Sequence, residues 1–391
     1  MNFAGSHVVN WLLDPDIVFL NHGSFGACPR PVLDLQTALR EQMEREPIQF
    51  LDRQYYSLLA DARAALGAFL GADPEDLAFV PNATTGVNTV LRSLAFSPGD
   101  QILVTNQAYN ACKNAVRFAA ARAGAEVVMA QPPFPLQNAD EVMDVVMRSV
   151  TTRTKLALID HITSPTALVL PIERLVAELA RRGVDTLVDG AHAPGMVPLH
   201  LDALGAAYYT GNCHKWLCAP KGAAFLHVRR DRQERIHPLT ISHGYNQPLG
   251  DSTRFRLEFD WTGTFDPTPC LCVPEAIRFM GSLLPGGWPE LMRHNRELAL
   301  RGRDLLCAAV NVLPPCPDDM LGSMAAAPLP DGDNGERFID PLQQTLYDRF
   351  RIEIPVMSWP VPPKRLIRLS AHIYNAAKQY QVLADALRTL L

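Results

Sequence analysis

Short apolar runs alternate with amphipathic segments through the middle of this chain, and that alternation constrains the fold more than any other feature. The runs are rich in β-branched and aliphatic residues and stand at 76–80, 101–105, 125–129, 155–160 and 185–190. Between them lie segments with helical spacing, an order typical of right-handed βαβ units. We therefore predict an α/β fold whose mostly parallel sheet fills about residues 71–260, with further strands of undetermined direction at 206–211 and 223–228.

Beyond about residue 270 the pattern changes. A helical region is followed by a Pro-rich stretch (328–338), a strand-like run (351–357) and a closing helix. We expect three parts: an N-terminal segment (1–30) that contributes to the functional site, a large domain (31–270) and a smaller C-terminal α+β domain (271–391).

Composition and charge disfavour several classes of protein. The 391 residues include 36 Lys and Arg against 41 Asp and Glu, and a formal charge of −5 does not suit a strongly basic nucleic-acid surface. No apolar run reaches the ~18 residues of a membrane span, and the start of the chain lacks the pattern of a secretory signal. The eight cysteines are scattered, and Cys270 and Cys272 are poorly spaced for zinc. We expect a cytoplasmic protein without a metal, nucleic-acid or membrane partner.

Polar residues follow the predicted strands, where an open α/β sheet binds its ligands. Thr84, Thr85 and Gly86 follow the first strand and would cradle a phosphate, although an ordinary threonine helix cap explains them equally well. Tyr109 follows the second, where it would stack on a planar ligand or pack at the rim.

A strand-end aspartate and a lysine carry the strongest chemical signal. Asp189 ends an apolar run and needs a cationic or hydrogen-bonding partner, while Lys215 stands beside His214 in an apolar and aromatic setting. Pyridoxal phosphate needs a lysine for its Schiff base, a carboxylate for its pyridine nitrogen and a phosphate site. Together with the threonines, these residues predict that cofactor and chemistry at the Cα of an amino acid.

Seven motifs extend this pattern over nearly the whole chain. They are FLNHGSFGACP at 19–29, VPNATTGVNTVLRSL at 80–94, DHITSPTALVLP at 160–171, VDGAHAPGM at 188–196, TGNCHKWLCAPKGAAFL at 210–226, WTGTFDPTP at 261–269 and RLIRLSAHIYN at 365–375. The sequence resembles fold type I pyridoxal-phosphate enzymes of the class V aminotransferase family, and within it isopenicillin N epimerase-like proteins. The resemblance implies a large cofactor-binding domain and a small C-terminal α+β domain.

The resemblance also implies roles for individual residues around the cofactor. Lys215 would form the Schiff base and Asp189 would pair with the pyridinium. His192 would bond near the phenolic oxygen, and Tyr109 would stack on the ring. The phosphate ligands would be Thr84, Thr85, Asn212 and His214.

Other implied roles concern the substrate and a second subunit. Arg368 would clamp the substrate α-carboxylate through two N–H donors. Asn21 and His22 would line the substrate entrance, although a plain turn histidine explains His22 equally well. The Gly263-Thr264 segment would reach the phosphate of a neighbouring subunit, which implies a homodimer with shared active sites.

The reaction is less constrained than the cofactor. A cysteine desulfurase needs a mobile thiolate shortly before the carboxylate-binding arginine, and residues 355–368 contain no cysteine. We predict an epimerase- or racemase-like enzyme acting at the Cα of an amino acid or an amino-acid-containing small molecule. β-Elimination with C–S cleavage is the alternative, and desulfuration or transamination ranks lower. A catalytically silent relative would lack Lys215, Asp189 or Arg368, and all three are present. A nicotinamide dehydrogenase would show G-x-G-x-x-G after its first strand, and residues 76–86 do not contain that motif.

Overall fold

A seven-stranded sheet forms the centre of the computed structural model, which describes residues 5–332 and 339–391. In spatial order its strands are β2 (Leu77–Val80), β8 (Ala224–Val228), β7 (Tyr208–Asn212), β6 (Asp185–Asp189), β5 (Thr154–Asp160), β3 (Gln101–Thr105) and β4 (Glu126–Ala130). The strands from β7 to β4 run parallel, whereas β8 is antiparallel to both of its neighbours. The predicted α/β fold is therefore confirmed, and the direction of the two further strands is settled.

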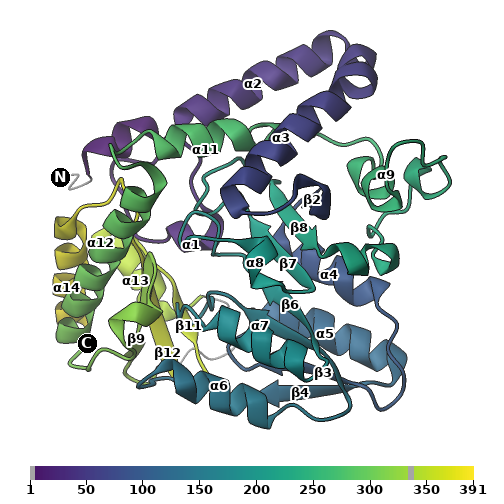
Figure 1. Ribbon diagram of the computed structural model, residues 1–391. Helices are drawn as coiled ribbons and strands as arrows, with labels where there is room; N and C mark the ends of the chain where they lie inside the picture. The colour runs from purple at the N-terminus through teal and green to yellow at the C-terminus, as the bar shows by residue number, and fades with distance from the viewer. Residues whose placement is uncertain (1–4, 333–338) are drawn as a thin grey trace.

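Helices cover both faces of this sheet, so its strands read as continuous apolar runs. Ile102 and Val104 of β3 join a cluster with α4 (Ala83–Ser93) and α5 (Asn110–Ala123). Leu103 points to the other face, where α6 (Ala139–Arg148) and α7 (Ile172–Arg181) pack. Figure 1 shows these helices around the sheet, and successive residues of one strand thus serve two cores.

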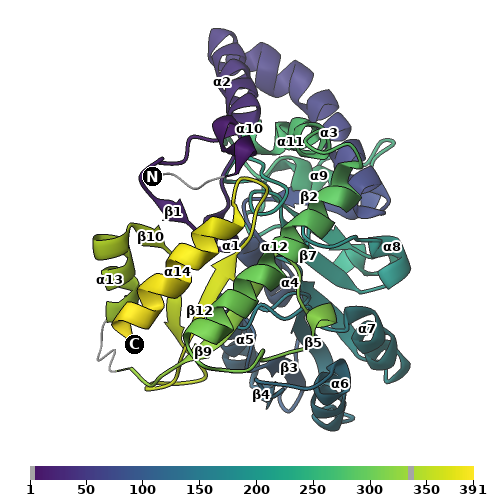
Figure 2. The same ribbon diagram turned by 90° about the vertical axis from the view of Figure 1, so that its left-hand side faces the viewer.

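A smaller antiparallel sheet belongs to the C-terminal part. It contains β11 (Val356–Ser358), β12 (Arg365–Ser370) and β9 (Met324–Leu329), and α12 (Gly287–Ala309) and α14 (Ala377–Leu390) lie side by side against it (Figure 2). The run predicted as one strand at 351–357 is two strands, because β10 (Ile352–Glu353) pairs with β1 (Val18–Phe19) and Pro355 precedes β11. Helix α13 (Pro341–Phe350) precedes β10, and residues 333–338 of the Pro-rich stretch lie outside the described residues.

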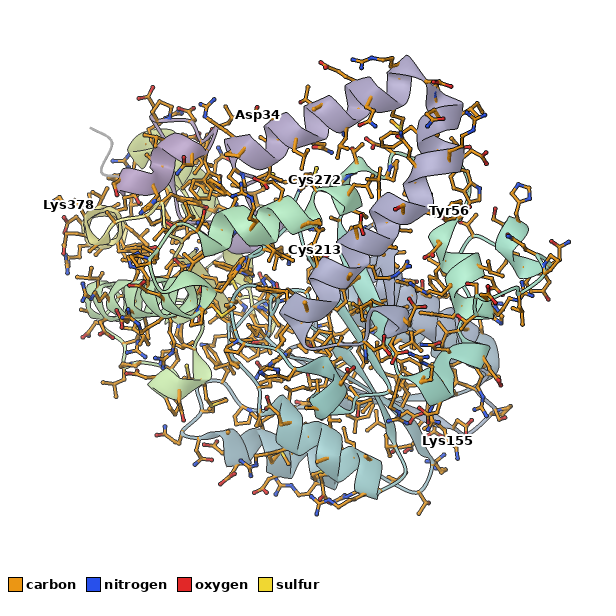
Figure 3. The ribbon with its side chains drawn as sticks, turned by 45° about the horizontal axis from the view of Figure 1, so that its top comes forward. Asp34, Tyr56, Lys155, Cys213, Cys272 and Lys378 are labelled. Carbon is orange, nitrogen blue, oxygen red and sulfur yellow. The ribbon has the colours of Figure 1, made fainter. Side chains whose placement is uncertain are left out.

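Two long helices, α2 (Arg30–Arg45) and α3 (Tyr55–Leu70), form a hairpin above the large sheet (Figure 1). Tyr56 points from α3 toward α9 (Arg254–Asp260), and Cys213 and Cys272 lie in the interior (Figure 3). The other helices are short: α1 (His22–Phe25), α8 (Leu201–Leu204), α10 (Thr268–Leu271) and α11 (Val273–Gly281). Among the described residues, no helix combines the length and apolar character that crossing a membrane requires.

The N-terminal segment approaches the functional loops closely at Gly26. A Cβ atom on Gly26 would lie 2.0 Å from the backbone oxygen of His214, and the φ angle of 71° also favours glycine. The backbone of Leu20 bonds on one side to Glu353 and on the other to Ser370. This segment therefore joins the small sheet to the loop that carries Lys215.

Candidate active site

A cavity of about 390 Å³ lies where the parallel strands of the large sheet end. Residues that the sequence predicts at separate strand ends meet in its lining: Thr84, Tyr109, Asp189, His192, Asn212, His214 and Lys215. They converge because the carboxyl ends of β3, β5, β6 and β7 lie at one edge of the sheet. The strand-end logic therefore locates one site.

The N-terminus of α4 opens onto this cavity. Asn82 caps the helix, because its Oδ1 accepts the N–H of Thr85 at 2.8 Å and the Thr85 hydroxyl at 3.1 Å. Asn212 Oδ1 accepts the N–H of Ala83 at 2.9 Å. Thr84 lines the cavity, whereas the Thr85 hydroxyl is committed to the cap. A helix N-terminus of this kind suits an anionic group such as a phosphate.

Asp189 is 3% exposed and is held by two donors. Cys112 donates its S–H to Oδ2 at 3.1 Å, and the N–H of Ala191 donates to Oδ1 at 3.0 Å. Burial and the nearby Asp189 charge raise the pKa of Cys112 well above its ordinary value, so this thiol remains a donor. Each oxygen of Asp189 therefore accepts one hydrogen bond from a neutral donor, and the residue lines the cavity.

Asp160 is a cavity residue that sequence reasoning missed. It ends β5 in register with Asp189 at the end of β6, and it is 2% exposed. Burial, and then the Asp189 charge, raise its pKa well above the ordinary value. Its Oδ2 has no hydrogen-bond partner among the described residues. The signal was present, since the run at 155–160 ends in aspartate just as the run before Asp189 does.

Lys215 and His192 contact each other inside the cavity. The lysine Nζ lies 3.1 Å from His192 Nε2, and the indole N–H of Trp216 donates to His192 Nδ1 at 3.4 Å. Burial, and then the charge of Arg368, lower the pKa of Lys215 to about 7. Burial, and then Lys215, push the pKa of His192 well below its ordinary value. A lysine with so low a pKa supplies a neutral amine, which is the nucleophilic form.

Arg368 reaches the cavity wall from β12. Its guanidinium donates to the backbone oxygen of Ser164 at 2.6 Å, to the Ser164 hydroxyl at 3.1 Å and to the Ser24 hydroxyl at 3.2 Å. Both serines line the cavity, and Arg368 is 3% exposed. Burial lowers the pKa of Arg368 to about 10. Its hydrogen-bond partners in the described part of the chain include no carboxylate, so the carboxylate of a ligand would supply the missing ion-pair partner.

Asn21 and His22 lie behind the cavity rather than in its lining. Asn21 donates to Glu353 Oε1 at 2.9 Å. His22 is 1% exposed, contacts the backbone oxygen of Lys215 through Nε2 at 3.0 Å and the hydroxyl of Tyr374 through Nδ1 at 2.7 Å. Burial lowers the pKa of His22 to about 3. The histidine therefore supports the main chain of the Lys215 loop.

His22 also belongs to a buried cluster with Cys218 and His372 that resembles a metal site in composition. The Cys218 Sγ lies 3.4 Å from His372 Nε2, and their candidate ligand atoms and that of His22 fall within 4.8 Å of one another. However, the two histidine rings stack at 4.2 Å with an interplanar angle of 19°. Since His22 Nε2 also bonds to the Lys215 carbonyl, the cluster is a hydrogen-bonded aromatic stack.

Thr264 does not reach the cavity within a single chain. It lines a separate hollow of about 490 Å³ together with Tyr56, Trp261 and neighbouring residues. Ile48, Tyr56 and Phe265, at 64%, 50% and 41% exposure, place large apolar side chains on the surface of this region. The predicted contact with a neighbouring phosphate would require a second copy of the chain.

The residues in the cavity suit pyridoxal phosphate as a donor set. Lys215 offers an amine for the aldehyde and Asp189 a carboxylate for the pyridine nitrogen. The N-terminus of α4 offers N–H and hydroxyl groups for the phosphate. The guanidinium of Arg368 has no carboxylate among its partners in the described residues, so it suits a ligand that carries a carboxylate.

Comparison with known proteins gives consistent results. The family description "Aminotransferase class-V" matches residues 32–256. Isopenicillin N epimerase of Amycolatopsis lactamdurans is 40% identical over 97% of this chain and 96% of that protein. The "Probable L-cysteine desulfhydrase, chloroplastic" of Arabidopsis thaliana is 32% identical over 97% of this chain and 84% of that protein.

A solved structure shares the fold. The cystine C-S lyase C-DES, in complex with cysteine persulfide, superposes with a TM-score of 0.80 at 23% identity and covers 95% of this chain and 97% of that one. A variant of C-DES carries glycine covalently linked to its PLP cofactor.

Proposed function

The chain belongs to the class V aminotransferase family and is a pyridoxal-phosphate-dependent enzyme of the epimerase-like kind, and from this premise we propose that it removes and returns the Cα proton of an amino-acid substrate. The observation that carries the proposal is the meeting of Lys215, Asp189 and His192 in one cavity, behind whose serine lining Arg368 is hydrogen-bonded. These residues supply each group that the cofactor and an amino-acid substrate need.

The residues that would hold the cofactor follow from their contacts. Lys215 would bond to the aldehyde carbon, and Asp189, fixed by Cys112 and Ala191, would face the pyridine nitrogen. Thr84, Asn212 and His214 would surround the phosphate, and Thr85 would act through the helix cap. Tyr109, 48% exposed at the start of α5, would cover the ring.

The bound cofactor supplies an electron sink that stabilises negative charge at the substrate Cα. Arg368 binds the α-carboxylate and so orients the Cα–H bond. Lys215, as a neutral amine near pH 7, accepts the Cα proton on its own face. Inversion needs a proton delivered from the opposite face.

A C–S lyase that carries out β-elimination is the second candidate, and the relative described as an L-cysteine desulfhydrase favours it. Elimination uses the same lysine and arginine and needs no thiol. Desulfuration by a cysteine nucleophile is disfavoured. All eight cysteines are buried, and none of them lines the cavity in the described part of the chain.

Purified holoenzyme in deuterated water distinguishes these reactions. We expect NMR to show deuterium entering at Cα with inversion when L-amino acids and sulfur-containing analogues are supplied. Release of pyruvate and ammonia would identify the lyase instead. Absence of both, with the cofactor bound, would refute the proposed chemistry.

We further propose that two copies share their active sites. The hollow that contains Thr264 carries exposed apolar side chains, which supports its burial against a second chain. Sedimentation should give a dimer. Thr264→Val should weaken cofactor binding without dissociating the dimer. A stable monomer that retains the cofactor would contradict this.

We also propose a cytoplasmic location and domain boundaries at residues 30 and 270. The large sheet falls within 31–270, and β9 to β12 fall within 271–391. Limited proteolysis would test the division, and fractionation of cells would test the location.

A further inference from the structure

His192 is held at both ring nitrogens by residues adjacent in sequence. The indole Nε1 of Trp216 lies 3.4 Å from Nδ1, and the Nζ of Lys215 lies 3.1 Å from Nε2. His192 is 2% exposed and Trp216 is 1% exposed, so little of either ring is accessible to water. The imidazole is therefore governed by these two contacts.

The indole contact determines where His192 carries its proton. An indole N–H can only donate, so Nδ1 must accept and is unprotonated. A neutral imidazole without a proton on Nδ1 has its proton on Nε2. A doubly protonated ring would have no acceptor for Trp216, and burial independently pushes the pKa of His192 well below its ordinary value.

The surroundings of His192 do not favour a charged ring. The titratable groups that most lower the pKa of His192 are Lys215 and His214 from the loop after β7, Arg368 from β12 and His22 from the N-terminal segment. None of these four is a carboxylate. Each one that carries charge opposes protonation of the imidazole.

The proton on Nε2 in turn sets the role of Lys215. An N–H at Nε2 must donate, and an ammonium group has no lone pair to accept it. The contact of 3.1 Å is therefore a hydrogen bond from His192 to a neutral amine. The depressed pKa of Lys215, about 7, is consistent with this.

We propose that Trp216 is a positioning residue that locks His192 in the Nε2–H form, so that His192 always presents a hydrogen-bond donor to the cavity. Once Lys215 is bonded to the cofactor, an anionic oxygen near His192 Nε2 would accept this hydrogen bond. The inference rests on the proposed function in one respect, since that function identifies the oxygen as the phenolic oxygen of pyridoxal phosphate. The tautomer itself depends on the protein alone.

The first experiment reads the tautomer in the protein without cofactor. Nitrogen-15 NMR of labelled histidine, with H192Q used to assign the signals, should show an unprotonated Nδ1 and a protonated Nε2 at neutral pH. In W216F we expect signals averaged between the two tautomers. Replacement of Trp216 by benzothienylalanine keeps the ring shape and removes only the N–H, so it should give the same result even if W216F folds poorly.

The matched control is W288F. Trp288 donates its indole N–H to the backbone oxygen of Ile277 at 2.9 Å, far in sequence from the cavity residues, and it contacts no histidine through that bond. Its loss should leave the His192 signals unchanged. An effect as large as that of W216F would mean that loss of a distant, partly buried tryptophan perturbs the ring equally, which would contradict the proposal.

The second experiment uses holoenzyme and follows the visible absorbance of the bound cofactor as a function of pH. A donor facing the phenolic oxygen stabilises its anionic form, so both Trp216 variants should raise the titration midpoint by about half to one pH unit. Unchanged His192 signals and an unchanged midpoint in both variants would overturn the proposal. A wild-type enzyme that shows no lysine-dependent absorbance would instead refute the proposed function, and the apoprotein spectra would still decide the tautomer.

Discussion

Asp160 and Asp189 end neighbouring parallel strands in register, and both carboxyl groups line the same cavity. Asp189 accepts from Cys112 and Ala191. Asp160 has backbone donors, among them the N–H of Tyr109, but its Oδ2 has no partner among the described residues. Two buried carboxyl groups that line one cavity do not both ionise readily. Because the pKa of Asp160 is raised well above its ordinary value, by burial and by Asp189, Asp160 is the protonated member.

This asymmetry predicts different results for the two amide variants. Asp160→Asn replaces one neutral group by another, so the affinity for pyridoxal phosphate should change by less than about threefold. Asp189→Asn removes the charge facing the pyridine nitrogen, and the affinity should fall by about ten- to hundredfold. Titration of apoprotein with the cofactor, followed by fluorescence, measures both. Equal losses in the two variants would show that Asp160 is ionised.

Lys215→Ala should abolish the visible absorbance of the lysine-bound cofactor, because Lys215 is the cavity lysine that contacts His192. Lys221 also lines the cavity, but its Nζ donates to the backbone oxygen of Gly26 at 3.0 Å. Lys221→Met is therefore the matched control and should retain the absorbance. If Lys215→Ala kept the band and Lys221→Met lost it, the two assignments would be reversed.

The depressed pKa of Lys215 predicts how reconstitution depends on pH. Burial, and then Arg368, lower this pKa from 10.5 to about 7, so the nucleophilic amine form grows as pH rises through about 7 and then saturates. The rate at which apoprotein takes up pyridoxal phosphate should follow that curve in stopped-flow absorbance. A rate that keeps rising steeply through the range of an ordinary lysine would contradict the environment described for Lys215.

The main features of the site could be predicted from sequence because they depend on strand ends. Asp189 ends β6 and Lys215 follows β7, and the carboxyl ends of these two strands meet at one edge of a parallel sheet. The same rule applies to Asp160, which ends β5 as Asp189 ends β6. The position of Asp160 was therefore predictable from the sequence as well.

Other features depend on contacts that no local pattern contains. His22 bonds to the backbone oxygen of Lys215 across 193 residues, and this contact follows from how the N-terminal segment packs. The pairing of β10 with β1 depends on the same packing, which is why the run at 351–357 was predicted as one strand. Thr264 lies outside the cavity in one chain, so the role predicted for it would need a second subunit.

Replacing Arg368 by a neutral residue should change activity and stability in opposite directions. Its guanidinium is buried on the hydroxyl and carbonyl oxygens of Ser164 and the hydroxyl of Ser24, without a carboxylate among its partners in the described residues. Burying an unpaired charge costs free energy, and burial accordingly lowers the pKa of Arg368 to about 10.

Arg368→Met should therefore leave the melting temperature of the apoprotein unchanged or raise it, while kcat/KM falls by about a hundredfold because a charge-assisted clamp on the substrate carboxylate is lost. Ser164→Ala removes one hydroxyl and keeps the cation, so its loss of kcat/KM should be closer to tenfold and should appear mainly in KM. Calorimetry and steady-state kinetics measure the two effects separately. A sharp fall in the melting temperature of Arg368→Met with little change in KM would mean that Arg368 serves the fold rather than the substrate.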